Sequence, residues 1–154
     1  MCRLTAIALL ASFVFVTAVH AQSTAAPNPL IGVWRVSEIA EANRPPITEP
    51  RPGLYIFTRQ HYSFMRINGV KPLPDYPSND KATDADKVAV FNALYLQSGT
   101  YTVKDNVLAT KALVAKSAFA MAAAGNQFDI ALTGNTLVLT QKPAGPTLKF
   151  VRVE

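Results

Sequence analysis

Cysteine is almost missing from this chain: Cys2 is the only one in 154 residues. A disulfide framework and a thiolate metal site are therefore excluded beyond the first few residues. Histidine is nearly as scarce, since only His20 and His61 are present. A zinc site of three or four protein ligands would need carboxylates to converge on one of them. Haem needs a single axial histidine, but His61 lies in a predicted turn, so we expect no metal and no cofactor.

Runs of like charge are missing as well. The chain has 15 basic and 10 acidic residues, a formal charge of +5, and its basic residues are scattered. A clustered basic face is the usual footprint of nucleic-acid binding, so we expect no nucleic-acid partner. The aspartates between residues 75 and 86 lack the glycine and the final glutamate of a calcium loop, and helix capping explains them better. No serine lies in a nucleophile motif, so a Ser–His–Asp site is not expected.

The amino terminus has the three parts of a secretory signal. Arg3 supplies a positive charge, residues 4–19 are apolar or small, and Ala21 precedes polar Gln22. The apolar run is shorter than the about 20 residues that a spanning helix needs, and the cysteine comes too early to carry a lipid. We therefore predict a signal peptide over residues 1–21, a secreted or periplasmic location, and no stable membrane anchor after cleavage.

After a small, polar and disordered lead-in at residues 22–29, the sequence predicts one domain over residues 30–154. β-Branched and aromatic residues alternate in short runs that turn residues separate. The predicted strands are residues 30–42, 54–58, 62–67, 100–104, 107–115, 127–132, 136–142 and 148–154. The alanines of residues 117–124 favour a helical turn that ends at Gly125.

The fold class expected from this pattern is all-β. Eight strands with mostly short connections, in a chain without disulfides, favour an antiparallel up-and-down barrel over a sandwich. Closure removes the exposed strand edges that would promote aggregation of an exported protein. One helix, residues 83–96, is inserted between the third and fourth strands within residues 68–98. Thr83 is its expected cap.

Several short motifs, taken together and in order, resemble one known family. The first strand has Gly32, one spacer and Trp34, and the last has Arg152 after an aromatic and a valine. The other segments that carry the resemblance are residues 52–58, 62–65, 99–103 and 134–139. This set resembles the bacterial lipocalin-like domain, a calycin-type β-barrel. The resemblance implies that Gly32, Trp34 and Arg152 close one end of the barrel, with the guanidinium across the indole.

The chain also departs from that family. Many secreted lipocalins have a disulfide that this chain lacks, and the insertion after the third strand is longer than a hairpin. The identity of a ligand is therefore not implied by the resemblance. An eight-stranded barrel is just wide enough for side chains or for one small ligand, so the sequence leaves open whether the interior is filled or hollow.

Side chains of one parity on each strand should face the interior. Aromatic residues with a few polar tips are typical of a pocket for a small apolar ligand. The candidate ligand-binding residues on the strands are Tyr55, Phe57, Tyr62, Phe64, Arg66, Tyr101 and Phe128, with Val103 and Ile130 of the same parities. Arg66 would bind a carboxylate if it points inward. The alternative is an arginine at the rim, in water.

The inserted helix has an apolar stripe that includes Phe91 and Tyr95. The stripe must be buried against something, and the barrel is the nearest apolar surface. We expect the helix either to cover the open end as a lid, with Phe91 and Tyr95 facing inward as ligand-binding residues, or to pack on the outer wall. The stripe alone does not choose between the two.

Three classes of function remain. The first is a protein that binds a small hydrophobic or amphipathic molecule in its barrel. The second is an interaction or inhibitor module that uses the loops at the barrel mouth. The third is an enzyme of the isomerase or cyclase type that acts by positioning its substrate. No catalytic residue is predicted, and the oligomeric state is left open.

Overall fold

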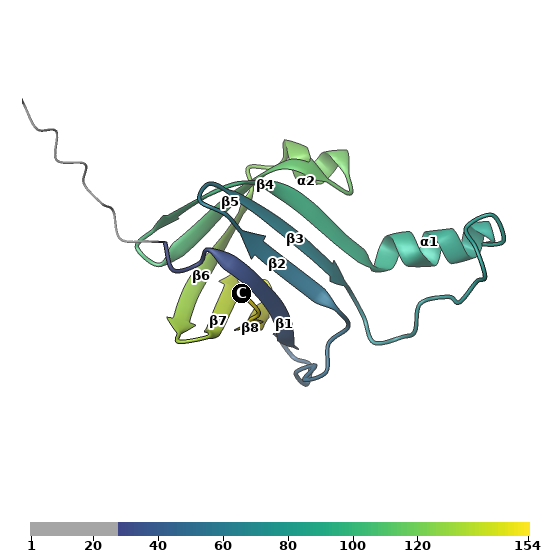
Figure 1. The fold of residues 1–154 in the computed structure, drawn as a ribbon, viewed down its shortest axis with the longest axis horizontal. Coiled ribbons are helices and arrows are strands. Elements are labelled where there is room, and N and C mark those ends of the chain that lie inside the picture. Colours follow the sequence, from purple (N-terminus) through teal and green to yellow (C-terminus); the bar gives the residue numbers. More distant parts are fainter. Residues whose placement is uncertain (1–27) are drawn as a thin grey trace, which may run out of the picture.

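The computed structural model describes residues 28–154, which form a closed barrel of eight antiparallel strands in sequential order. The strands are β1 (Gly32–Ala40), β2 (Gly53–Phe57), β3 (His61–Ile67), β4 (Leu94–Lys104), β5 (Val107–Ala115), β6 (Asn126–Thr133), β7 (Thr136–Gln141) and β8 (Thr147–Arg152) (Figure 1). The predicted all-β, up-and-down barrel is therefore confirmed. The predicted signal peptide, residues 1–21, and most of the lead-in lie outside the described residues. Within the described part, no helix is long and apolar enough to cross a bilayer.

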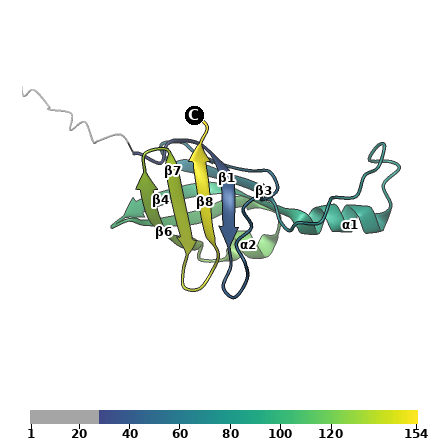
Figure 2. The ribbon, with the colours of Figure 1, turned by 90° about the horizontal axis from the view of Figure 1, so that it is seen from below.

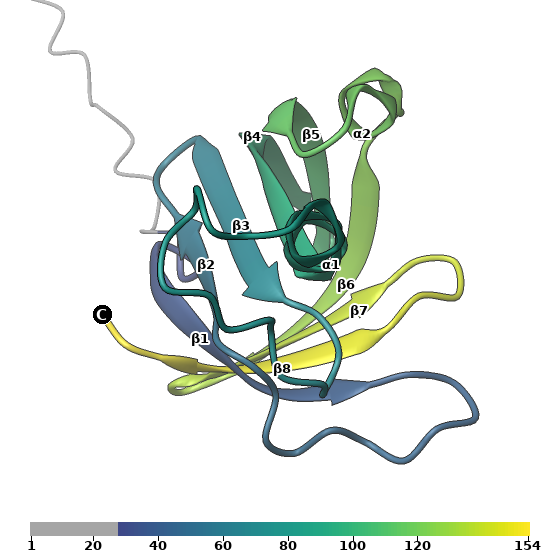
Figure 3. The same cartoon turned by 90° about the vertical axis from the view of Figure 1, so that its right-hand side faces the viewer.

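The ring consists of two well-paired halves joined by two short seams. Strands β2 to β5 form one half, and β6, β7, β8 and β1 form the other (Figure 3). Figure 2 shows the second half with its strands side by side. At the seams, β1 pairs with β2 only over residues 32–35, and β5 pairs with β6 only over residues 107–110. The two halves thus share few main-chain hydrogen bonds.

The two ends of the barrel differ in their connections. Tight turns join β2 to β3, β4 to β5 and β6 to β7 at one end, which we call the narrow end. Asp105 and Asn106 form one of these turns with positive φ angles of 51° and 59°, the left-handed pair that a two-residue hairpin requires. Longer segments connect the strands at the other end, which we call the mouth: residues 41–52, 68–93, 116–125 and 142–146.

Side chains fill the barrel from the narrow end to its middle. The rings of Tyr55 and Phe64 stack with centroids 3.9 Å apart, and Phe57 meets Tyr101 edge to face at 5.2 Å. The remaining fully buried core residues are Leu30, Trp34, Leu108, Phe128, Leu137, Leu139, Leu148 and Phe150. The interior predicted from strand parity is therefore a packed core over this part of the barrel, and only the mouth is left for a ligand.

The segment before β1 closes the narrow end. Leu30 is almost completely buried, and its carbonyl accepts a hydrogen bond of 2.8 Å from the indole Nε1 of Trp34. Asn28 donates to the hydroxyl of Tyr101 at 2.8 Å. Asn28 and Pro29, which were expected in the disordered lead-in, are instead bonded to the barrel, because their polar groups find partners on its rim.

Arg152 fastens the same segment from the opposite side. Its guanidinium carbon lies 4.1 Å from the centre of the Trp34 ring, and it donates to the carbonyls of Ile31 at 2.8 Å and Pro29 at 2.6 Å. Gly32 has a φ of +138°, and a Cβ there would collide with the main chain of Glu154. The glycine is therefore needed for the last residues of the chain to pass this close to β1.

The inserted helix differs from the expectation in length and in position. Helix α1 spans Asp84–Ala93 with Thr83 as its cap, and Leu94, Tyr95 and Leu96 belong to β4 instead. The expectation of a lid or of a helix on the outer wall, with Phe91 facing inward, is wrong: α1 points away from the barrel (Figure 1) and has no buried side chain. The reason is that residues 94–97 pair with β3 and carry the helix past the end of the sheet.

The second helical segment agrees with the expectation. Helix α2 (Ala118–Ala122) is capped by Ser117, whose hydroxyl accepts a hydrogen bond from the amide of Ala120, and Gly125 follows it with a φ of +104°. Lys111 donates to two carbonyls at its carboxyl end, those of Met121 at 3.2 Å and Ala123 at 2.7 Å. These bonds hold α2 beside β5 at the mouth.

Candidate ligand-binding site

The interior of the barrel changes from apolar to polar toward the mouth. On β3 the inward side chains run from Tyr62 through Phe64 to Arg66. On β4 they run from Tyr101 to Gln97 and Tyr95. The polar interior groups of the mouth are those of Tyr55, Arg66, Tyr95, Gln97, Thr110, Asn126 and Gln141. This half of the barrel is therefore where a polar ligand group would be held.

Arg66 is the one cation among these groups, and neighbouring side chains fix its position. Its Nε donates to Oδ1 of Asn68 at 2.8 Å, and one terminal nitrogen lies 3.4 Å from the hydroxyl of Tyr55. The guanidinium carbon lies 4.5 Å from the centre of the Tyr95 ring. Within residues 28–154, no carboxylate forms an ion pair with Arg66. Because a guanidinium has five N–H donors, three remain for a ligand.

Tyr55 and Tyr95 surround this guanidinium as neutral phenols. Burial raises the pKa of both hydroxyls, and the charge of Arg66 offsets part of that rise. The Tyr95 hydroxyl accepts a hydrogen bond of 2.6 Å from the side-chain amide of Gln97, which is almost fully buried. The site thus presents one positive charge against neutral groups, an arrangement that favours an anion.

Tyr62 adds a further polar group, deeper in the barrel. Its side chain is 3 % exposed, and its hydroxyl has no hydrogen-bond partner within the described residues. Burial raises its pKa, so this hydroxyl also stays protonated. A buried hydroxyl without a partner costs on the order of 1–3 kcal/mol, and the neighbouring Thr110 side chain, which also offsets part of the rise in pKa, reduces that cost.

A partly apolar groove of about 290 Å³ adjoins the polar cluster at the mouth. Ile39 and Ile47, which form an isolated β-bridge, supply its apolar side together with Val70. Its rim carries the exposed ion pair of Arg44 and Glu41, 3.0 Å apart. Gly69, another lining residue, directly follows the Asn68 that accepts from Arg66, so the groove begins one residue along the chain from a partner of that guanidinium.

The structure separates the predicted site residues into two groups. Phe57, Phe64, Tyr101 and Phe128 lie in the packed core, with Tyr55 and Tyr62 buried beside them and their hydroxyls toward the polar half. Arg66 and Tyr95 come together at the mouth. Phe91 is on α1, with 53 % of its surface exposed, and takes no part. Of the residues that shared a predicted parity, Ile130 packs against the core and Val103 is largely exposed.

Sequence reasoning did not find Gln97, Asn68 or the apolar pair Ile39 and Ile47. Gln97 has the parity of Tyr95 on β4, so it would have been found had that strand been predicted to begin at residue 94. The bridge between Ile39 and Ile47 joins β1 to a proline-rich loop, and no local pattern announces such a bond. Within residues 28–154, no three His, Cys, Asp or Glu side chains gather into a possible metal site.

Two solved structures are similar to this chain. One is an uncharacterized protein from Bacteroides eggerthii, with 13 % identity, 80 % of this chain and 98 % of that chain covered, and a TM-score of 0.49. The other is a lipocalin-like protein from Bacteroides uniformis, with 14 % identity, 80 % and 97 % coverage and the same TM-score. Likeness at this level says nothing about a shared ligand. No protein-family model matches the sequence, and no curated protein does. By its own topology, the chain is a closed, sequential, eight-stranded antiparallel β-barrel.

Proposed function

We propose that this protein is a binding protein for a small amphipathic anion, which it holds at the mouth of the barrel. The observation that carries the proposal is Arg66, a half-buried guanidinium that has free N–H donors and no carboxylate partner within the described residues. Two of its terminal N–H groups can bind both oxygens of one carboxylate, the strongest common geometry for an anion. Stacking on Tyr95 keeps the guanidinium in place before the ligand arrives.

The filled core decides how such a ligand is oriented. Phe64, Tyr55 and their neighbours occupy the centre of the barrel, so an apolar tail has no room below Arg66. The head group therefore enters first, and the tail lies outward in the groove of Ile39, Ile47 and Val70. The groove's volume of about 290 Å³ is near the lower limit for small-molecule sites, so the ligand is small.

The test uses octanoate as the probe and 1-octanol as its uncharged counterpart, both measured by isothermal titration calorimetry. Octanoate should bind more tightly than octanol. Arg66→Gln should weaken octanoate binding by about 10–100-fold, because a charge-assisted hydrogen bond contributes about 1.5–3 kcal/mol. Arg66→Lys should give an intermediate loss, since an ammonium keeps the charge without the two-pronged geometry.

The matched control is Arg35→Gln, which removes an equal charge from the exposed outer face of β1 and should leave octanoate affinity unchanged. Equal losses in Arg35→Gln and Arg66→Gln would mean that net charge alone attracts the probe. Octanoate affinity in Arg66→Gln equal to that of the unaltered protein would refute the site. Failure of octanoate and its longer homologues to bind the unaltered protein would refute the ligand class.

The proposal includes export, which is supported by the charged, apolar and small-residue order of residues 1–21. Amino-terminal sequencing of the protein from the cell envelope or the medium should begin at Gln22. A product that keeps Arg3 would contradict the proposed cleavage.

The projecting helix α1 favours a second function, in protein interaction.

A further inference from the structure

Residues 68–93, which we call the arm, project from the mouth instead of covering it (Figures 1 and 2). Helix α1 forms its second part, and no side chain of α1 is buried. Val88 and Phe91 are 57 % and 53 % exposed. Their spacing puts them on one side of the helix, one turn apart. An apolar side that its own barrel leaves uncovered calls for another surface.

The base of the arm is held firmly. Lys116, which follows β5, donates to the carbonyl of Phe91 at 3.0 Å and to that of Leu94 at 2.7 Å. Its ammonium also lies 4.8 Å from the centre of the Phe91 ring. These contacts neutralise the carboxyl end of α1, where a cation is favoured by the helix dipole, and they keep α1 in line with β4. The direction of the arm is thus fixed by these contacts, and it does not fold back onto its own barrel.

The outer wall of the same barrel has an apolar groove of about 270 Å³ near the mouth. Leu54, Met65 and Leu96 form its floor as direct cross-strand neighbours on β2, β3 and β4. Between 36 % and 43 % of the surface of each is exposed. Pro52, Gly53, Arg66, Ile67 and Leu94 complete the lining, which we call the wall groove. No residue of α1 contributes to it.

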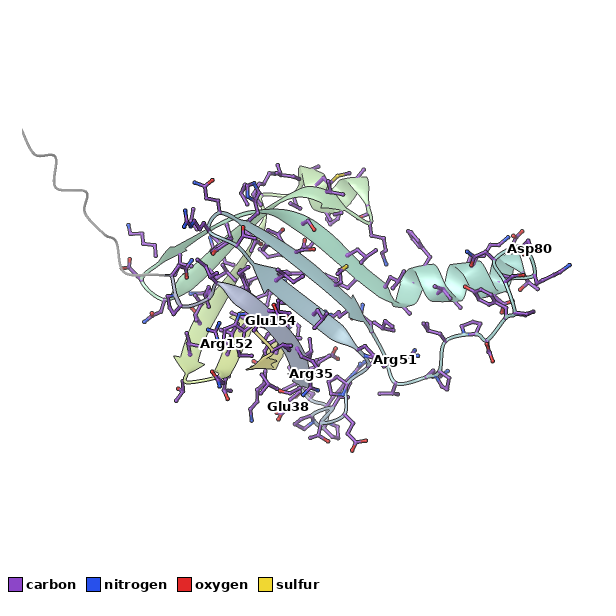
Figure 4. All side chains as sticks on the ribbon, viewed as in Figure 1. Arg35, Glu38, Arg51, Asp80, Arg152 and Glu154 are labelled. Carbon is purple, nitrogen blue, oxygen red and sulfur yellow. The ribbon has the colours of Figure 1, made fainter. Side chains whose placement is uncertain are left out.

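The arm and the barrel carry opposite charges. Residues 68–93 hold four acidic and three basic side chains, whereas the rest of residues 28–154 holds eleven basic and six acidic ones. Arg35 lies directly across the sheet from Leu54, and Arg51 directly precedes Pro52 of the wall groove. Neither forms an ion pair within residues 28–154. Asp80 lies at the far end of the arm, well away from both (Figure 4), so the arm cannot neutralise its own barrel.

We infer that two copies of this chain exchange arms, with α1 of each copy seated in the wall groove of the other. Such a dimer is two-fold symmetric, so every contact is made twice. A stable interface needs about 1,000 Å² in total, or about 250 Å² from each helix side and each groove. Half the lateral surface of a ten-residue helix, about 15 Å long and 10 Å across, is about 240 Å², close to that share. The exchange covers the apolar side of α1 and brings the arm's acidic first turn to Arg35 and Arg51.

The first test is sedimentation velocity of the unaltered protein at rising concentration, with three single variants. The unaltered protein should sediment as a dimer, and Phe91→Asp and Met65→Asp should raise the dimer dissociation constant at least about tenfold, because each buries a charge against apolar surface. Phe119→Asp is the matched control: Phe119 is the most exposed phenylalanine of residues 28–154, at 83 %, and lies on α2. The Phe119→Asp variant should remain dimeric.

The second test establishes the pairing directly, in a Cys2→Ser background that has no other thiol. One sample carries Phe91→Cys and another carries Met65→Cys. Mixed and oxidised, they should form a disulfide-linked heterodimer, whereas Phe119→Cys mixed with Met65→Cys should not.

Three results would overturn the inference. One is an unaltered protein that stays monomeric up to high micromolar concentration. Another is a dimer that neither Phe91→Asp nor Met65→Asp weakens. The third is a monomer that binds anionic lipid vesicles through Met65, which would assign the wall groove to a membrane. Arg66 lines the wall groove as well, but it is unchanged in every variant used here and none of these results measures octanoate binding, so the dimer and the ligand site can fail independently.

Discussion

Replacing Arg152 with methionine should loosen the narrow end of the barrel. The side chain makes two short hydrogen bonds, to the carbonyls of Ile31 and Pro29 at 2.8 and 2.6 Å, and a long one of 3.5 Å to the carbonyl of Glu154, to which we assign no energy. Its guanidinium carbon lies 4.1 Å from the centre of the Trp34 ring. We assign about 1 kcal/mol to each hydrogen bond, because the donors are partly exposed, and about 1 kcal/mol to the cation–π contact. Methionine keeps most of the apolar contact. The expected loss is therefore about 2–3 kcal/mol of unfolding free energy.

The assay is urea unfolding followed by tryptophan fluorescence. Trp34 is the only tryptophan in the chain and it is fully buried, so its emission reports the closure that Arg152 makes. The midpoint should fall while the slope with urea stays the same, and the melting temperature should drop by roughly 10 °C. Arg59→Met, in the turn between β2 and β3, is the matched control and should shift stability by less than about 0.5 kcal/mol.

A double-mutant cycle separates the ring contact from the hydrogen bonds. Trp34→Phe and Arg152→Met, alone and combined, should show a coupling free energy of about 1 kcal/mol. A loss in Arg152→Met no larger than that in Arg59→Met would refute the reasoning, because the three contacts would then contribute nothing net. A full loss with zero coupling would assign the effect to the two carbonyls alone.

Three further predictions follow from the geometry. Burial raises the pKa of four tyrosines, Tyr55, Tyr62, Tyr95 and Tyr101. Because the folded state then favours the neutral phenol, the unfolding free energy should be constant below about pH 10 and fall as the pH rises beyond it. Absorbance near 295 nm should show these phenols ionising only when the protein unfolds. Thr83→Ala removes the capping box with Asp86 and should reduce helical circular dichroism while leaving the urea midpoint unchanged, since α1 is not part of the core. Gly99→Ala should cost about 1–3 kcal/mol in urea unfolding, because its Cβ would strike the Lys111 carbonyl at the β4–β5 bulge; an unchanged midpoint would contradict that close approach.

The strands were predictable because alternation is a local signal. Tyr55 and Phe57 are buried, whereas Leu54, on the opposite face of the same strand, is exposed. The period of two identifies such a strand without any knowledge of its partner. Arg66 was placed on the inward parity for the same reason. Whether the interior is full depends on how the rings of facing strands meet, as Phe64 does with Tyr55, and parity does not contain that information.

The arm was not predictable, because its last residues are ambiguous. Leu94, Tyr95 and Leu96 continue the apolar stripe of a helix, yet they also suit a strand. The choice is made by residues almost thirty positions earlier, since Arg66 and Met65 pair with Tyr95 and Leu96. That single long-range pairing moves Tyr95 into the site and leaves Phe91 outside, and it also hides Gln97 from sequence reasoning.

The two short seams have a consequence for how the barrel opens. A sub-global opening that parts the halves breaks the short ladders at residues 32–35 and 107–110 and the bond from the amide of Ile130 to the carbonyl of Asn106, and each half keeps its own ladder. Cohesion across the seams then comes chiefly from rings that face each other between halves, such as Tyr55 with Phe150 and Phe64 with Phe128. Apolar attraction weakens on cooling, whereas ladder hydrogen bonds do not share that dependence. As the temperature falls, hydrogen exchange of the backbone amides at the seams should therefore become faster relative to that of amides inside the halves. The two halves are then separate units of local stability.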